Sequence, residues 1–165
     1  MALHKHLWTM AVEGIGEYLT ASRMSLDHRK SDGGCLGYPA TLLLLCVVNA
    51  LGTYLQGDDV MIEKKTAKIT RGEPFRVLNH TIFGLNLRHK EVKLIEQSYR
   101  NRLAHNAIIE RGSSMILSEN DPPFVFPSGH VEIRVLSLYR SVEQAWDRFP
   151  KERIQDWERR QRNSK

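Results

Sequence analysis

The most constraining feature of the sequence is the segment from Gly33 to Gly57, which contains no charged residue and has LLLLCVV near its centre. A membrane-spanning helix needs about 20 predominantly apolar residues. Here the densely apolar part extends only from Pro39 to Leu51, and Thr53 and Gln56 dilute it further on. A helix that is apolar on all sides is typical of the middle of a helical protein. The segment therefore predicts a buried central helix over about residues 39–56, and no membrane span.

Composition is that of an ordinary folded protein. The 165 residues are 41% apolar and 26% charged, which is enough for one compact domain with a hydrophobic core. The net charge of +5 permits a polyanionic partner without identifying one. Cys35 and Cys46 lack the spacing of a zinc site or a disulfide framework, and the first residues lack the apolar stretch of a secretory signal. We therefore expect reduced thiols in a cytoplasmic protein.

Hydrophobic spacing predicts a mainly all-α fold, a four- to five-helix bundle of the up-and-down type. Besides the central helix, we expect helices over four segments: residues 3–25, 73–84, 89–106 and 135–149. Residues 57–73 are expected to form a charged loop. Short β-favouring runs between turn sequences predict a small β-hairpin or flap around residues 115–135. No change in composition marks a second domain, so we expect one bundle over residues 1–150 and a charged helix or tail over residues 151–165.

The predicted helix over residues 89–106 carries polar side chains opposite its apolar stripe. The stripe is spaced three, four and four residues apart and consists of Val92, Ile95, Tyr99 and Leu103. At 100° per residue, Asn101 and His105 lie about 200° from this stripe, and the long side chain of Arg100 can join them. An ordinary solvated helix end explains the same geometry, because histidine and arginine interact well with the last carbonyl groups of a helix.

The string YRNRLAHN, residues 99–106, resembles the signature of the HEPN superfamily of small helical bundles. In that signature an arginine, usually followed by a polar residue, precedes a histidine by four to six intervening positions. Arg100, Asn101 and His105 fill these places, with four residues between the arginine and the histidine. The expected helix order is also similar, with a long first helix, an apolar second helix and the motif on a later one.

This resemblance implies a metal-independent endoribonuclease without a cofactor, in which two protomers of a homodimer bring their motifs into one cleft. His105 would serve the proton transfers at the ribose 2′-OH and the leaving oxygen, because imidazole titrates near neutral pH. Arg100 would stabilise the charge of the phosphorane, and Asn101 would orient the histidine or hold a phosphate oxygen. Attack by the 2′-OH on RNA would leave a 2′,3′-cyclic phosphate. We expect no metal site.

Some residues keep two interpretations. Arg102 lies on nearly the same face as His105, where it either binds phosphate or is simply solvated. The basic residues that crowd the C-terminus form either a solvated helical face or an electrostatic track for RNA.

The biological role is also open. HEPN toxins with an antitoxin partner often carry a tyrosine two residues after the histidine, which the partner modifies, but Ala107 stands there in this chain. That departure argues against this style of neutralisation by an antitoxin, and leaves a stand-alone ribonuclease or a phage-defence effector. The superfamily also contains non-catalytic members, so the alternative is a module that binds RNA, nucleotide or protein. A structural dimer, in which the motif merely forms an interface, is a third hypothesis.

Overall fold

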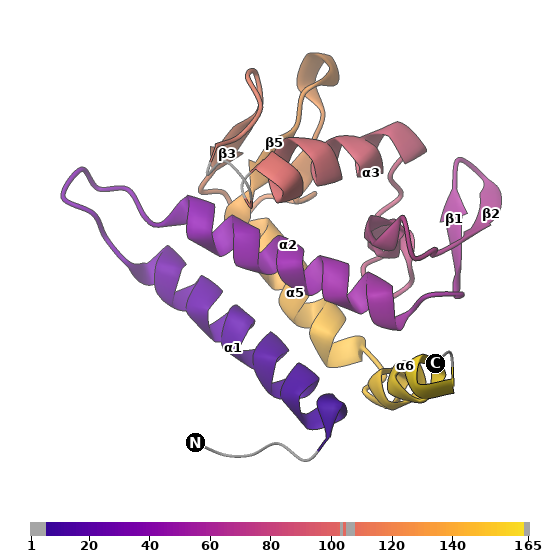
Figure 1. Cartoon of the computed structure of the whole chain (residues 1–165). Coiled ribbons are helices and arrows are strands. Elements are labelled where there is room, and N and C mark those ends of the chain that lie inside the picture. Colours follow the sequence, from indigo (N-terminus) through magenta and orange to yellow (C-terminus); the bar gives the residue numbers. More distant parts are fainter. Residues whose placement is uncertain (1–5, 103, 105–107, 164–165) are drawn as a thin grey trace.

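The computed structural model describes residues 6–102, 104 and 108–163, and this part of the chain is mostly helical with two small sheets (Figure 1). The prediction of a mainly α-helical fold is confirmed at this level. The α-helices are α1 (Leu7–Asp27), α2 (Gly37–Tyr54), α3 (His89–Ile95), α5 (Val135–Arg148) and α6 (Glu152–Asn163).

Helix α2 lies at the centre of the fold, as its lack of charge predicts. Pro39 occupies its first turn, where a proline costs no helical hydrogen bond. Helix α1 packs along one side of α2, α5 crosses behind it and α3 lies on the opposite side from α1 (Figure 1). By length and composition α2 is the one helix in the described part of the chain that is long and apolar enough to cross a membrane, yet 44% of it is buried inside the fold. This placement favours a core helix.

The core is formed mainly by large aliphatic and aromatic side chains of α2, α5 and the segments that cover them. Burial of such side chains is the main favourable contribution to folding. The largest fully buried residues are Leu44, Leu45, Leu51, Leu55, Ile69, Phe75, Leu78, Ile95, Tyr99, Ile133, Leu138 and Ile154.

The charged segment after α2 differs from the expected loop, and that prediction is wrong. Strand β1 (Asp59–Ile62) pairs antiparallel with β2 (Lys65–Lys68) in a hairpin. The two turn residues, Glu63 and Lys64, both have positive φ angles, 51° and 65°. Two-residue hairpin turns of this kind usually have the sequence Asn-Gly or Asp-Gly, and this turn has neither. Because of this turn and the lysines of β2, the sequence pattern did not predict the hairpin.

The helix expected over residues 73–84 is shorter and narrower than predicted. It is the 3₁₀ helix η1 (Pro74–Asn79), which packs against the C-terminal half of α2. Gly52 makes this contact possible, because a Cβ atom at that position would lie 2.0 Å from the carbonyl oxygen of Pro74.

The β-favouring region near residues 115–135 forms a three-stranded sheet in the order β3-β5-β4. Strand β4 (Phe124–Val125) and strand β5 (Glu132–Arg134) are antiparallel, as a hairpin requires. Strand β3 (Ser114–Ile116) falls on the first of the predicted β-favouring runs, but it pairs with β5 in parallel, with Met115 opposite Ile133, and the prediction of a hairpin or flap did not include this pairing. A short 3₁₀ turn, η3 (Pro127–Gly129), connects β4 to β5.

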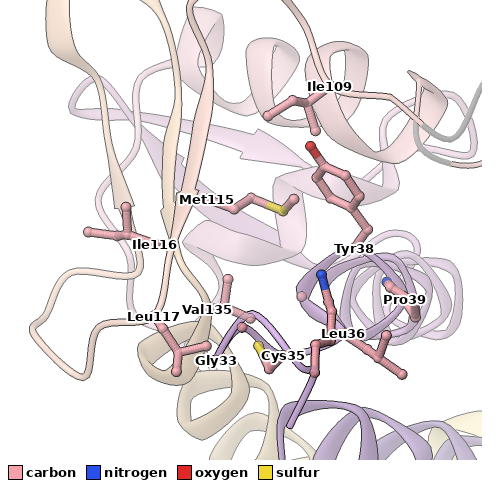
Figure 2. Close-up of a pocket in the computed structure, with 13 residues that line it drawn as sticks. Gly33, Cys35, Leu36, Tyr38, Pro39, Ile109, Met115, Ile116, Leu117 and Val135 are labelled. Carbon is pink, nitrogen blue, oxygen red and sulfur yellow. The ribbon is translucent and has the colours of Figure 1, made fainter. Parts of the chain in front are cut away.

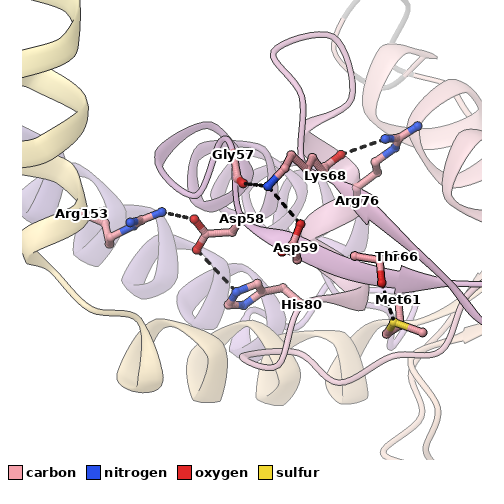
Figure 3. A network of polar contacts seen from close by, with 9 residues as sticks. All are labelled: Gly57, Asp58, Asp59, Met61, Thr66, Lys68, Arg76, His80 and Arg153. Carbon is pink, nitrogen blue, oxygen red and sulfur yellow. Dashed lines mark hydrogen bonds and ion pairs between the residues drawn. The ribbon is translucent and has the colours of Figure 1, made fainter.

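Helix α6 is joined to the hairpin by a cluster of charges (Figure 3). Arg153 forms an ion pair with Asp58, which precedes β1, and Asp58 Oδ2 also lies 3.7 Å from His80 Nε2. The backbone N–H of Ile82 donates to His80 Nδ1 at 3.4 Å. Burial lowers the pKa of His80, the Asp58 carboxylate opposes this change, and Arg153 adds to it. His80 is therefore favoured in its neutral form beside an ion pair that is already complete.

Candidate functional site

The predicted motif helix is helical but not regular. After α3 the backbone widens into the π-helix η2 (Glu96–Asn101), which contains Arg100 and Asn101. A π-helix forms i→i+5 hydrogen bonds, and such segments occur often at functional sites. The angle of 100° per residue assumed for this stretch is therefore wrong. Asn101 is half-buried instead of pointing fully away from the core.

Tyr99 fixes the π-helix to the sheet. Its side chain is fully buried, and its hydroxyl donates to the carbonyl oxygens of Ser114 and, at 2.8 Å, Val131. Burial raises the pKa of this hydroxyl, so it stays protonated and remains a donor. Val92, Ile95 and Tyr99 of the predicted apolar stripe are buried as expected. Tyr99 therefore ties the residue before Arg100 to β3 and to the residue that precedes β5.

Arg100 and Asn101 are brought together. Arg100 Nη1 donates to Asn101 Oδ1 at 2.9 Å, and both side chains are half-buried. The element that carries Arg100, η2, contacts α2, and burial raises the pKa of the Cys46 thiol on α2 while the positive charge of Arg100 lowers it in part. No carboxylate of the described residues forms an ion pair with Arg100. Its remaining N–H donors can therefore bind an anion.

Arg102 has a different environment. Its Nη2 atom lies 3.5 Å from Glu110 Oε1, and the Ser98 hydroxyl donates to the other oxygen of the same carboxylate. Glu110 thus connects the end of the motif helix to the segment that follows it. Neither of the two interpretations for Arg102, phosphate binding or simple solvation, included this ion pair with Glu110.

His105 lies outside the described residues, as do Leu103, Asn106 and Ala107. Its chemical role therefore stays a prediction from the sequence. Ala104 and Ile108, which flank this gap, are exposed.

The side of α2 that is turned away from α5 is incompletely covered near Arg100. Leu42, Leu43, Cys46 and Ala50 are all half-buried there, at helical spacing. This surface, which we call the open face of α2, carries no charged residue. It could be buried against another protein surface without removing a charge from water.

The other candidates of the sequence give no second site. No three His, Cys, Asp or Glu side chains in the described ranges are grouped so that they could hold a metal ion. Three C-terminal arginines have acidic partners: Arg153 pairs with Asp58, Arg159 with Asp156, and Arg162 with Glu158. These pairs favour a solvated and structural helix face over a track for RNA.

Sequence reasoning did not identify Cys46, Ser98 or Glu110 as neighbours of the motif. A half-exposed thiol in an apolar helix and an acidic residue after a helix are common, so no sequence signal singled them out. The chain matches no protein-family model, no curated protein and no solved structure.

Proposed function

We propose that the protein is a metal-independent endoribonuclease of the HEPN type, with a HEPN-like bundle fold, acting in the cytoplasm as a homodimer. The single observation that supports this proposal most is the Arg100–Asn101 pair. The Arg100 guanidinium has no acidic partner among the described residues, and the side-chain oxygen of Asn101 accepts a hydrogen bond from its Nη1. The same pair occupies the first two places of the motif.

In the proposed reaction, His105 removes the proton of a ribose 2′-OH, and the resulting oxygen attacks the adjacent phosphorus. The P–O5′ bond then breaks, the leaving oxygen takes a proton, and a 2′,3′-cyclic phosphate remains. Arg100 donates to the non-bridging phosphate oxygens, where charge accumulates in the transition state. Asn101 orients Arg100 through its side-chain oxygen, which makes it a positioning residue.

The homodimer follows from the motif and from the open face of α2. One HEPN-type motif supplies half of a cleft, and the open face lies beside Arg100 in this chain. A second copy packing there would bring the two arginines to the same interface. A role in toxin action or phage defence belongs to the same proposal.

The test is cleavage of a mixed-sequence RNA in the presence of EDTA. Arg100→Ala and His105→Ala are expected to lose about 10²- to 10³-fold in rate, the range for removal of one preorganised catalytic group. Arg71→Ala, which removes an exposed arginine in the loop before η1, is the matched control and should cleave normally. The products should end in a 2′,3′-cyclic phosphate.

Equal cleavage by all four proteins would refute the assignment of the motif. RNA binding without cleavage by the unmutated protein would instead support the non-catalytic binding module. If the unmutated protein neither binds nor cleaves RNA, the remaining hypothesis is the structural dimer.

A further inference from the structure

A pocket of about 520 Å³ opens at the N-terminal end of α2 (Figure 2). One wall is the loop that enters α2, with Leu36 and Pro39. The facing wall is formed by Met115 and Ile116 of β3 and by Leu117, which follows the strand. Pockets that bind small organic groups have volumes of about 300–1,000 Å³ and mostly apolar walls, so this one has a suitable size and surface.

Tyr38 gives the pocket its most distinctive chemistry. Its ring is 49% exposed, and its hydroxyl points toward Ile109 with Met115 alongside (Figure 2). No hydrogen bond to that hydroxyl occurs among the described residues. An exposed ring beside a methionine thioether and aliphatic side chains can hold a flat aromatic group by stacking and by contact with sulfur.

The charge of the pocket suits a ligand that belongs to an anionic chain. Lys30 is the one charged residue among the described residues that line it. No carboxylate of the described part lines the pocket, and the nearby Asp32 carboxylate accepts a hydrogen bond at 2.9 Å from the backbone N–H of Gly34.

The pocket is close to the Arg100–Asn101 pair. The hydroxyl of Tyr99, the residue before Arg100, donates to the carbonyl oxygen of Ser114, which is next to the wall residue Met115 in β3. Tyr38 and Cys46, the α2 residue near Arg100, are eight positions apart, which at a rise of 1.5 Å per residue is about 12 Å. Ile109, on the rim, follows the motif closely in the chain. One flexible strand can therefore contact both places.

We propose that this pocket holds an unstacked base of the single-stranded RNA whose phosphate is bound by Arg100. The inference rests on the proposed function, because it takes RNA as the substrate. Proteins that bind single strands commonly stack a splayed base on an aromatic side chain while basic residues hold the backbone. Tyr38 is the stacking residue, the β3 side chains form the opposite wall, and Lys30 holds a neighbouring phosphate.

The test is binding of a ten-nucleotide mixed-sequence RNA with 2′-O-methyl riboses, which cannot undergo 2′-OH attack. Each nucleotide is replaced in turn by an abasic one. One or two positions should weaken binding by about 5- to 30-fold, as expected for the loss of one stacked base. Tyr38→Ala should weaken binding of the intact RNA to a similar extent and abolish the effect of those abasic positions.

Two further variants control the result. Tyr18→Ala removes a tyrosine of similar exposure on α1 that does not line the pocket, and it should bind like the unmutated protein. Leu117→Glu places a carboxylate in the pocket wall and should reproduce the effect of Tyr38→Ala without involving α2. Both substituted side chains of the pocket are exposed, so the unfolding midpoints should stay unchanged.

The outcomes separate this inference from the proposed function. If cleavage depends on Arg100 but neither abasic substitution nor Tyr38→Ala weakens RNA binding, the base-binding role of the pocket is refuted and the endoribonuclease proposal stands. Base-dependent binding that requires both Tyr38 and Arg100, without cleavage, would support the pocket and overturn the catalytic proposal. Absence of both RNA binding and cleavage would overturn both.

Discussion

The two faces of helix α2 have similar composition and different surroundings. On the buried face, Leu44, Val48 and Leu51 are fully enclosed by α1, α5 and η1. On the open face, Leu43 and Cys46 remain half-exposed beside Arg100. Both faces lack charge, so hydrophobicity alone does not distinguish them.

The surrounding charges make the difference clear. Near the C-terminal end of the buried face, Arg153 is neutralised by Asp58, and Arg76 pairs with Glu73. Beside the open face, Arg100 has an amide oxygen as its partner and no acidic one among the described residues. Arg100 thus keeps N–H donors for a charged partner beside an uncovered apolar surface, whereas the arginines near the enclosed surface are already paired with carboxylates. Substitutions on and near the two faces test this difference.

The largest expected effect is on the buried face. Gly52→Ala should lower the free energy of unfolding by more than about 3 kcal/mol, because the new Cβ would lie 2.0 Å from the Pro74 carbonyl oxygen and η1 would have to move. Gly14→Ala in α1 is the matched control, since nothing lies within 4 Å of its Cβ position. That substitution should stabilise the protein by about 0.5–1 kcal/mol through helix propensity. Urea denaturation measures both. Equal effects of the two substitutions would contradict the tight packing of α2 on η1.

The second prediction concerns the open face. In the proposed homodimer, Leu43→Glu should weaken association at least about tenfold, because the proposed interface would then bury a carboxylate without a partner. The isolated protomer should keep its stability to within about 1 kcal/mol, since the new side chain reaches water. Sedimentation over a range of concentrations measures the association.

Leu7→Glu is the control for this variant, because Leu7 is an exposed leucine on α1, away from Arg100. Dissociation by Leu7→Glu and not by Leu43→Glu would place the interface on α1. The open face of α2 would then be an ordinary partly covered helix.

The elements determined by local pattern could be predicted from the sequence. The long charge-free run fixes α2, and regular apolar spacing fixes α1 and α5. The β1–β2 hairpin could not be predicted, since Glu63 and Lys64 adopt a turn that their side chains do not favour. Tertiary contacts stabilise it, because Val60 and Ile62 are buried in the core and Arg76 donates to the carbonyl oxygen of Lys68 at 2.8 Å.

The candidate site was predicted less completely than the fold, because part of its geometry depends on contacts between residues distant in the chain. The motif places Arg100 beside Asn101 in the sequence, so their contact needs no tertiary information. The π-helix contains Tyr99, whose hydroxyl bonds to Ser114 and Val131, residues distant in the chain, and its wider turns shift the faces of the helix from those that regular periodicity predicts. The role of the motif in catalysis stays a prediction.

The third prediction is a pH dependence at the buried end of α2. Burial depresses the pKa of His80 in the folded protein below the ordinary value of 6.5, so the unfolded chain binds more protons between the two values. Stability from the neutral imidazole is therefore fully present above pH 6.5 and is lost as the pH falls toward the folded pKa. Urea denaturation at pH 7.5 and pH 5.5 should show a smaller acid-induced loss in His80→Gln than in the unmutated protein. Parallel losses would mean that His80 makes no contribution.

The smallest expected effect is at Cys46, which connects the open face to Arg100. Burial raises the pKa of this thiol and the guanidinium of Arg100 lowers it in part, so removing the positive charge should raise the pKa further. Arg100→Met keeps an apolar side chain over the sulfur while removing the charge. The pH dependence of alkylation by iodoacetamide should shift to higher pH at Cys46 and stay unchanged at Cys35, which lies in the loop before α2 and serves as the internal control. An unchanged profile at Cys46 would mean that Arg100 does not lie over α2 in solution. The open face would then lose the charge that makes it a candidate binding surface.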